Sequence, residues 1–193
     1  MPTDQFLPHE GLTTQRLVLH PASQAYAAAL LAYRIDNRAH LKRWEPARAD
    51  DFYTLPSVEK RLAAMEREMS AQSSLYLLLI AQDTGELIGN CNFTNIVRGV
   101  FEACHLGFSI AHRHEGRGFM REALTVAIAH MFGTLGLHRI MANHRPENER
   151  SAQLLTRLGF EREGLARAYL HIDGAWADHV LTSLINPADC PPQ

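Results

Sequence analysis

Residues 108–123 read FSIAHRHEGRGFMREA, and they are the most informative stretch of the chain for its fold. An apolar segment over 101–111 has the composition of a strand, and a short loop with Gly116 and Gly118 follows it. From Gly118 on, apolar residues recur at helical spacing, which predicts a long amphipathic helix. This order of strand, glycine loop and helix points free backbone N–H groups and the positive helix end at one place. Such a place suits a phosphate or a pyrophosphate.

Two common phosphate motifs do not fit this loop. A P-loop needs Lys-Ser/Thr after its second glycine, and Phe119-Met120 stands here. A dinucleotide fingerprint needs a third glycine after the first strand of a parallel unit, whereas three predicted strands joined as hairpins precede this loop. Arg113, Arg117 and Arg121 are candidates for charge-assisted contacts to an anion. The alternative is that the glycines only shape a tight turn.

The rest of the chain predicts an α/β domain with a mixed, mainly antiparallel sheet of six to seven strands flanked by helices. Strands are expected over 14–20, 75–81, 87–96, 101–111, 138–144, 160–172 and 176–185, and helices over 23–35, 57–71, 118–132 and 148–158. The stretch 37–55 looks mostly irregular. We expect one domain over 1–193, with a core of about 12–185 and loose ends at 1–11 and 186–193.

Composition narrows the class of protein. The 193 residues are 46% hydrophobic and 21% charged, with a formal net charge of −2, which argues against general DNA binding. No apolar run approaches the ~20 residues of a membrane span, and residues 1–12 do not resemble a signal peptide. Three cysteines without a close pair favour a reducing compartment, so a cytoplasmic protein is expected. No metal site is predicted, because the metal-ligand spacings are missing and His112 and His114 point apart on an extended segment.

Residues 115–120, EGRGFM, resemble the pyrophosphate motif Gln/Arg-x-x-Gly-x-Gly/Ala of the GNAT superfamily of acetyl-CoA-dependent N-acetyltransferases. Two positions depart from the motif, Glu115 and Met120. The backbone donors over 116–121 survive both changes. Glu115 places a negative charge near a pyrophosphate, and this should weaken binding unless the side chain turns outward or pairs with Arg113 or Arg117.

A second match lies in residues 143–152 and 158–160, which look like the Asn-x-x-Ser helix start and the Gly-Phe strand entry of the superfamily. The resemblance implies that Asn148 contacts the pantetheine arm, although a helix N-cap is the alternative role and one side chain can fill both. It also implies that the fourth and fifth strands splay apart and hold this arm between them. The acetyl-CoA residues implied are Phe108, Ser109, Ile110, Glu115, Gly116, Arg117, Gly118, Phe119, Met120, Arg121, Asn148 and Ser151.

The resemblance narrows to the RimJ/RimL branch through residues 37–46, NRAHLKRWEP. Residues 92–99, 138–143 and 172–181 look like those members that acetylate the N-terminal alanine of the fifth small-subunit ribosomal protein. Substrate contacts are therefore expected from Trp44, which closes the acceptor pocket or is a core plug, and from Glu45, which binds the ammonium. Asn143, where related RimI enzymes have a catalytic Glu, completes the expected substrate set.

The implied reaction is direct attack of a neutral amine on the thioester through a tetrahedral intermediate. An α-amine has a pKa of about 7.7–8.0, so a distant base acting through water suffices. Glu102, on the splayed strand, and Glu163 are the candidate bases, with His105 and His144 near the same gap. Ser151 is the candidate proton donor for the leaving thiolate.

Two other functions stay open at this stage. One is acetylation of a small amine, such as a polyamine or an aminoglycoside, for which Glu45, Asp50 and Asp51 form the only carboxylate cluster in the right stretch. The other is a ribosome-associated binding module without turnover, motivated by the basic run Arg34, Arg38, Lys42 and Arg43. The expected partner is a ribosomal-protein N-terminus or the small subunit, and the chain is a monomer or a homodimer.

Overall fold

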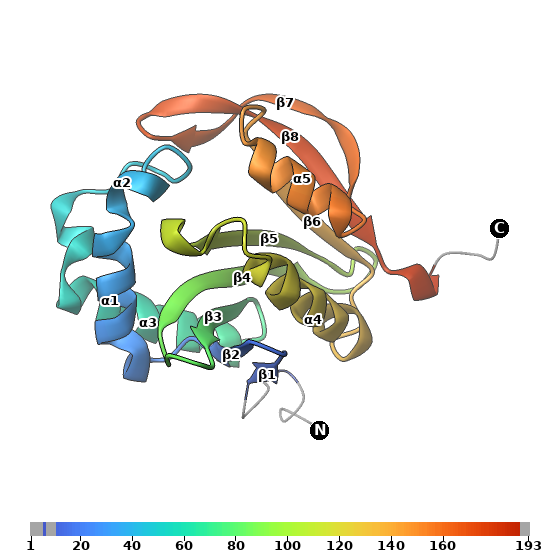
Figure 1. The fold of residues 1–193 in the computed structure, drawn as a ribbon. Helices are drawn as coiled ribbons and strands as arrows, with labels where there is room; N and C mark the ends of the chain where they lie inside the picture. Colours follow the sequence, from blue (N-terminus) through green and yellow to red (C-terminus); the bar gives the residue numbers. More distant parts are fainter. Residues whose placement is uncertain (1–5, 7–10, 190–193) are drawn as a thin grey trace.

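The computed structural model describes residue 6 and residues 11–189, and within them all strands belong to one sheet. The strand order is β1-β2-β3-β4-β5-β6-β8-β7 (Figure 1). The strands are β1 Leu12–Thr13, β2 Leu17–Pro21, β3 Leu75–Ala81, β4 Leu87–Val97, β5 Ala103–Ile110, β6 Arg139–His144, β7 Glu161–Ile172 and β8 Ala175–Ile185. The α-helices are α1 Ala27–Asp36, α2 Arg38–Leu41, α3 Leu55–Ser70, α4 Phe119–Gly133 and α5 Glu149–Arg157.

The α/β class and the mixed, mainly antiparallel sheet are confirmed, but the sheet has eight strands instead of six to seven. The single strand expected over 14–20 is two short antiparallel strands, β1 and β2. Thr14 reverses the chain between them: its backbone N–H donates to Leu17 O at 2.9 Å, and its Oγ1 accepts from Leu17 N at 2.9 Å. A side-chain oxygen that bonds the backbone locally in this way favours a turn over a continuous strand.

Two elements lie inside the stretch that the sequence analysis expected to be irregular. One is α2, and the other is a 3-10 helix over Asp50–Tyr53. The loose ends expected at 1–11 and 186–193 fall mostly outside the described residues. Phe6 is described and is buried against the core, and His130 Nε2 lies 3.3 Å from its carbonyl oxygen.

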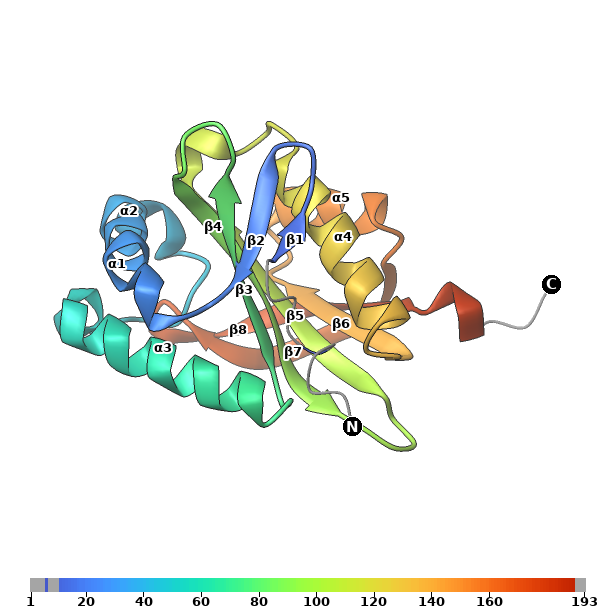
Figure 2. The same cartoon turned by 90° about the horizontal axis from the view of Figure 1, so that it is seen from below.

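Helices cover both faces of the sheet, with α1 and α3 on one face and α4 and α5 on the other (Figure 2). The central strand β3 is consequently apolar throughout, because the side chains of both of its faces are covered. Leu62 of α3, Phe93 of β4 and Leu124 of α4 are fully buried. Among the described residues, none of the helices combines the length and the apolar character that a membrane crossing demands.

The fourth and fifth strands of the prediction are β5 and β6, and the expected splay between them is observed. Their parallel pairing covers only Ala103–His105 on β5 and Arg139–Met141 on β6. On its other edge β5 stays paired with β4 as far as Ile110. The second half of β5 therefore presents an edge that β6 does not cover.

Candidate active site

The glycine loop follows β5 at the open end of the splay. Gly116 and Gly118 have φ angles of +71° and +81°, a region that side-chain-bearing residues rarely adopt. Gly118 is the N-cap of α4, so the first-turn N–H groups of that helix are exposed to the loop. A Cβ on Gly116 would meet no atom within 4 Å, so the backbone at this residue is open to a ligand.

The uncovered edge of β5 carries main-chain groups that can pair with an extended ligand. Ala111 N donates to Ile88 O on the β4 side, at 2.8 Å, and Glu102 O accepts from the β6 side. Because main-chain groups alternate along a strand, Phe108 and Ile110 direct theirs toward the gap. These are the two residues that the sequence analysis expected to pair with pantetheine, and strand addition of this type is a common recognition mode.

The start of α5 faces the same edge of the sheet, since α5 follows β6 and β6 runs parallel to β5. The Asn148 side chain accepts from Ser151 N at 3.1 Å, so it caps the helix. This is the alternative role raised for Asn148, and its Nδ2 group remains available to a ligand. Ser151 is half-buried in the first turn.

Glu115 is neutralised, but not by the partners expected from the sequence. Arg150 of α5 pairs with its carboxylate, and His40 Nε2 and His112 Nδ1 each lie 3.3 Å from it. Arg113 instead pairs with Glu86. Glu115 therefore joins the glycine loop to α2 and α5, and its charge is compensated by residues that are remote in sequence.

One group among the described residues has the donors of a metal site, namely His40, His112 and Glu115, with ligand atoms within 4.8 Å of one another. The extended segment expected for His112 and His114 is a 3-10 helix over His112–His114. The ring centroid of His112 lies 4.8 Å from that of His40. The guanidinium of Arg150 also pairs with Glu115, so it already balances the charge of this carboxylate.

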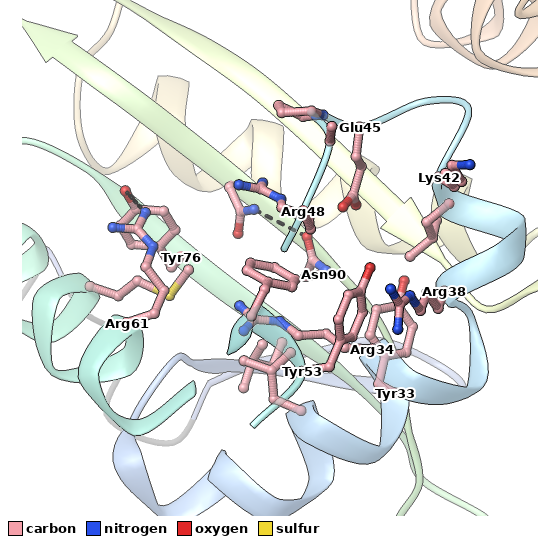
Figure 3. A pocket seen from close by; sticks show the side chains of 18 of the residues that line it. Tyr33, Arg34, Arg38, Lys42, Glu45, Arg48, Tyr53, Arg61, Tyr76 and Asn90 are labelled. Atoms are coloured by element: carbon pink, nitrogen blue, oxygen red, sulfur yellow. Dashed lines mark hydrogen bonds between the residues drawn. The ribbon is translucent and has the colours of Figure 1, made fainter. Parts of the chain in front are cut away.

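A pocket of about 370 Å³ lies on the face of the sheet that α1 and α3 cover. It is bounded by α1, the loop before α3 and strands β3 and β4 (Figure 3). We call it the acceptor-side pocket. Five cationic side chains and two carboxylates line it, together with aromatic rings and amides. The charged residues are Arg34, Arg38, Lys42, Arg48, Arg61, Glu45 and Asp173; the aromatic and amide residues are Tyr33, Phe52, Tyr53, Tyr76, Asn90 and Asn92.

Glu45 is the carboxylate that points into this pocket (Figure 3). Burial raises its pKa above the ordinary value of 4.5, and the nearby Arg48 and Arg34 charges offset part of that effect. The Glu45 carbonyl accepts from Asp173 N at 3.0 Å, so the tip of the β7–β8 hairpin holds this loop in place. A carboxylate with a raised pKa can bind an ammonium group and accept its proton.

A hydrogen-bonded chain connects the pocket to β5. Tyr33 Oη and Ser109 Oγ are 2.8 Å apart, and Asn90 Nδ2 donates to Ser109 Oγ at 2.9 Å. Burial raises the pKa of Tyr33, so the hydroxyl stays protonated. The side chain of Ser109 thus faces the acceptor-side pocket, while its neighbours Phe108 and Ile110 present main-chain groups to the splay.

The two candidate bases, Glu102 and Glu163, lie away from the splay. Glu102 precedes β5 instead of standing on it, and it accepts from Arg98 Nη1 at 3.0 Å and Gly99 N at 2.8 Å, which lower its pKa. Glu163 accepts from Arg139 at 2.6 Å and Ser183 at 2.8 Å, with its pKa lowered likewise. Both carboxylates are ionised and paired at the end where β5 and β6 are still joined.

His105 and His144, which the sequence analysis expected near the same gap, lie in different surroundings. His105 is the last β5 residue paired with β6, on the same face as Thr94, which lines the acceptor-side pocket. Its Nδ1 is buried without a hydrogen-bond partner, and burial lowers its pKa. His144 is buried, and its Nδ1 lies 2.9 Å from Arg145 O.

Of the expected substrate residues, Glu45 lines the acceptor-side pocket but Trp44 is not among its lining residues. Trp44 is half-buried beneath Arg43, whose guanidinium carbon is 4.2 Å from the ring centroid. Asn143 lies on the splayed part of β6, and its Nδ2 donates to Tyr169 Oη at 3.4 Å.

Arg34 and Arg48 are site residues that the sequence analysis did not assign to a pocket. The run of cationic residues Arg34, Arg38 and Lys42 was the available signal, although α1 ends at Asp36 and no single helix carries all three. The structure places all three in the pocket lining.

The loop, the splay and the acceptor-side pocket together define an acyl-CoA-dependent transferase site, and the chain belongs to the GNAT acetyltransferase family, whose Acetyltransferase (GNAT) domain matches residues 16–161. It is 48% identical to the [ribosomal protein uS5]-alanine N-acetyltransferase of Escherichia coli K12, over 94% of this chain and 93% of that protein. The cosubstrate of the family is acetyl-CoA, which the backbone donors and the open β5 edge fit.

Solved structures agree with this assignment. The ribosomal-protein-S5-alanine acetyltransferase of Vibrio fischeri superposes with a TM-score of 0.88 at 37% identity, covering 93% of this chain and 98% of that one. RimJ of Mycobacterium smegmatis, solved in complex with CoA-disulfide, gives 0.84 at 30% identity, covering 92% of this chain and 85% of that one. The RimJ/RimL resemblance seen in the sequence is thereby confirmed.

Proposed function

We propose that this acetyltransferase acts in the cytoplasm and transfers the acetyl group of acetyl-CoA to the α-amine of the N-terminal alanine of a ribosomal protein, uS5. The observation that carries the proposal is the acceptor-side pocket, which is linked to β5 through Tyr33 and Ser109 and holds the half-buried carboxylate of Glu45. The 48% identity to an enzyme named for this acceptor supports it.

In this proposal each residue has a defined task. Glu45 binds the incoming ammonium and holds its proton until the neutral amine attacks the thioester directly. His105 is the second group on this face that can accept a proton, since its lowered pKa keeps the ring neutral and its Nδ1 has no hydrogen-bond partner. Ser151 protonates the departing thiolate from the start of α5. Main-chain groups of Phe108 and Ile110 and the loop over 116–121 hold the cosubstrate.

The pocket argues against a small polyamine or an aminoglycoside as acceptor. Such substrates carry several positive charges and need several carboxylates, whereas five cations and two carboxylates line this pocket. Asp50, one of the carboxylates considered for that alternative, is exposed and pairs with Arg38 at 2.7 Å. Of the basic run that motivated a ribosome-binding module, Arg34, Arg38 and Lys42 line this pocket, and Arg43 lies over the Trp44 ring.

The test is a competition between two matched peptides, one with a free N-terminal alanine and a blocked lysine, the other with the reverse. A lysine amine has a pKa about 2.5 units higher than an α-amine and must lose its proton at greater cost, so the alanine peptide should react much faster. Its kcat/KM should rise up to about pH 8 and then level. Equal or faster acetylation of the lysine peptide would overturn the proposal.

A further inference from the structure

The acceptor-side pocket holds more positive charge than the acceptor amine can use. Arg34 and Arg48 both lie against Phe52, with their guanidinium carbons 4.2 and 4.5 Å from the ring centroid. The carboxylate of Glu45 interacts electrostatically with both guanidinium groups. Two guanidinium groups thus converge on one carboxylate, and that carboxylate is assigned to the ammonium of the acceptor.

The other cations of the pocket are already paired. Arg38 bonds Asp50 at 2.7 Å, Arg61 bonds Glu68 at 3.0 Å, and Lys42 lies 3.9 Å from Asp173. Arg34 differs, because its Nη1 is buried and has no hydrogen-bond partner. A buried donor without a partner destabilises the fold, and the effect is larger when the donor is charged. An anionic ligand group would remove that cost with a strong charge-assisted bond.

The size of the pocket indicates where such an anion comes from. An alanine methyl group fills a small part of about 370 Å³, so the following residues of the acceptor can enter as well. An extended peptide advances about 3.3–3.6 Å per residue, which brings side chains close to the acceptor terminus within reach of the pocket wall. The anion is therefore expected on the same polypeptide as the amine.

We propose that the acceptor-side pocket selects acceptors with an acidic side chain, Asp or Glu, within the first few residues after the N-terminal alanine, and that Arg34 and Arg48 bind its carboxylate. This inference rests on the proposed function and adds a specificity to it. Glu45 binds the terminal ammonium, and the two arginines bind the carboxylate that follows. The peptide is thus recognised by a pair of opposite charges in a fixed order.

The experiment uses the full-length protein, acetyl-CoA and a set of peptides with a free N-terminal alanine. Each carries one Glu at a position from 2 to 6, and each has a matched Gln peptide. The parent should prefer the Glu peptide over its Gln partner by about fivefold or more in kcat/KM at one or two adjacent positions. The preference should lie mainly in KM and should shrink with added salt, because it is electrostatic.

Arg34→Gln and Arg48→Gln should each bring this Glu/Gln ratio close to one. Arg48 is exposed, so its variant keeps the test valid if Arg34→Gln folds poorly. Arg67→Gln is the matched control, because Arg67 is exposed on α3 outside the pocket lining, and it should keep the parent ratio. In the charge swap Arg34→Glu, a Lys at the preferred position should become better than Glu.

Each result has a distinct meaning. Acetylation of all the alanine peptides with a Glu/Gln ratio near one at every position would overturn this inference and leave the proposed function intact. A parent preference that survives in both arginine variants would overturn it too. If no alanine peptide is acetylated while the lysine peptide is, the proposed function fails, and this inference fails with it.

Discussion

Glu45 couples the chemistry of the site to the stability of the fold. Burial raises its pKa, so the folded state holds the proton more tightly than the unfolded chain does. A raised carboxyl pKa contributes stability that is fully present below the ordinary value of 4.5 and is lost as pH rises through the raised value. At neutral pH the ionised carboxylate therefore destabilises the fold, a cost that binding of the acceptor ammonium offsets.

Glu45→Gln should be more stable than the parent at pH 8, and the two melting temperatures should converge as pH falls to about 4. Because the amide cannot take the proton or bind the ammonium as strongly, kcat/KM for an alanine peptide should drop about tenfold or more. Thermal unfolding between pH 4 and 8 and peptide kinetics check both effects. A stability gap that does not depend on pH would contradict this account of Glu45.

Ser151→Ala should lower kcat by roughly 10²-fold while the affinity for acetyl-CoA barely changes, because a general acid acts mainly in the transition state. The cap on α5 should survive, since Asn148 bonds the backbone N–H of residue 151 and not its hydroxyl. Steady-state kinetics at saturating substrates provide the measurement. Ser57→Ala, at a half-buried position on α3, is the control. An unchanged kcat in Ser151→Ala would leave water as the proton donor.

At the scale of elements, the junction of β5, the glycine loop and α4 places the cosubstrate. Gly118 combines a left-handed backbone with the N-cap position of α4. A β-branched residue there must either adopt a strained conformation or move the first turn of the helix. The donors at this helix start therefore depend on one glycine, even though Glu115 departs from the family motif and is neutralised by Arg150.

Gly118→Val should weaken CoA binding by over tenfold, which corresponds to about 1.4 kcal/mol. Gly133→Ala is the matched control at the other end of α4, where no positive φ is required and an added Cβ meets no atom within 4 Å. It should bind CoA as the parent does and gain up to about 0.5–1 kcal/mol of helix stability. Calorimetric titration measures the affinity of both variants for CoA. Parent-like affinity in Gly118→Val would refute the pyrophosphate assignment.

At the scale of the whole molecule, the sheet is two sections joined at one short parallel pairing. Only Ala103–His105 of β5 pair with β6, and beyond them the sections separate around the cosubstrate gap. The stretch 37–46 bridges the opening from outside: Asn37 accepts from His112 N at 3.0 Å, and Arg145 donates to Arg43 O at 2.9 Å. A ligand in the gap that contacts both β5 and α5 would strengthen this junction.

CoA should therefore raise the melting temperature of the whole chain. At about 100 times its dissociation constant, binding adds about 2.7 kcal/mol, which for a protein of this size corresponds to roughly 5–11 °C. Thermal unfolding with increasing CoA measures the shift. Gly118→Val should show a much smaller shift than Gly133→Ala at equal CoA, and a shift of equal size in both would place the binding site elsewhere.

Most of the helices and strands, and the loop for the cosubstrate, could be predicted from the amino-acid sequence. Strands β3, β6 and β8 and helices α3, α4 and α5 lie within a few residues of their predicted bounds. Their signals are local: the hydrophobic period sets the type of element, and glycines such as Gly118 mark where one ends and the next begins. The splay between β5 and β6 was likewise expected, through the resemblance to the superfamily.

Which side chains come together in the site could not be predicted from the sequence and depends on the packing of the elements. The acceptor-side pocket takes Arg34 from α1, Arg48 from a loop, Asn90 from β4 and Asp173 from the β7–β8 turn. Glu115 pairs with Arg150 of α5, although Arg113 and Arg117, which are closer in the sequence, were the expected partners. The physical reason is that strand order and the parallel β5–β6 step set these distances, whereas a one-dimensional pattern records only neighbours along the chain.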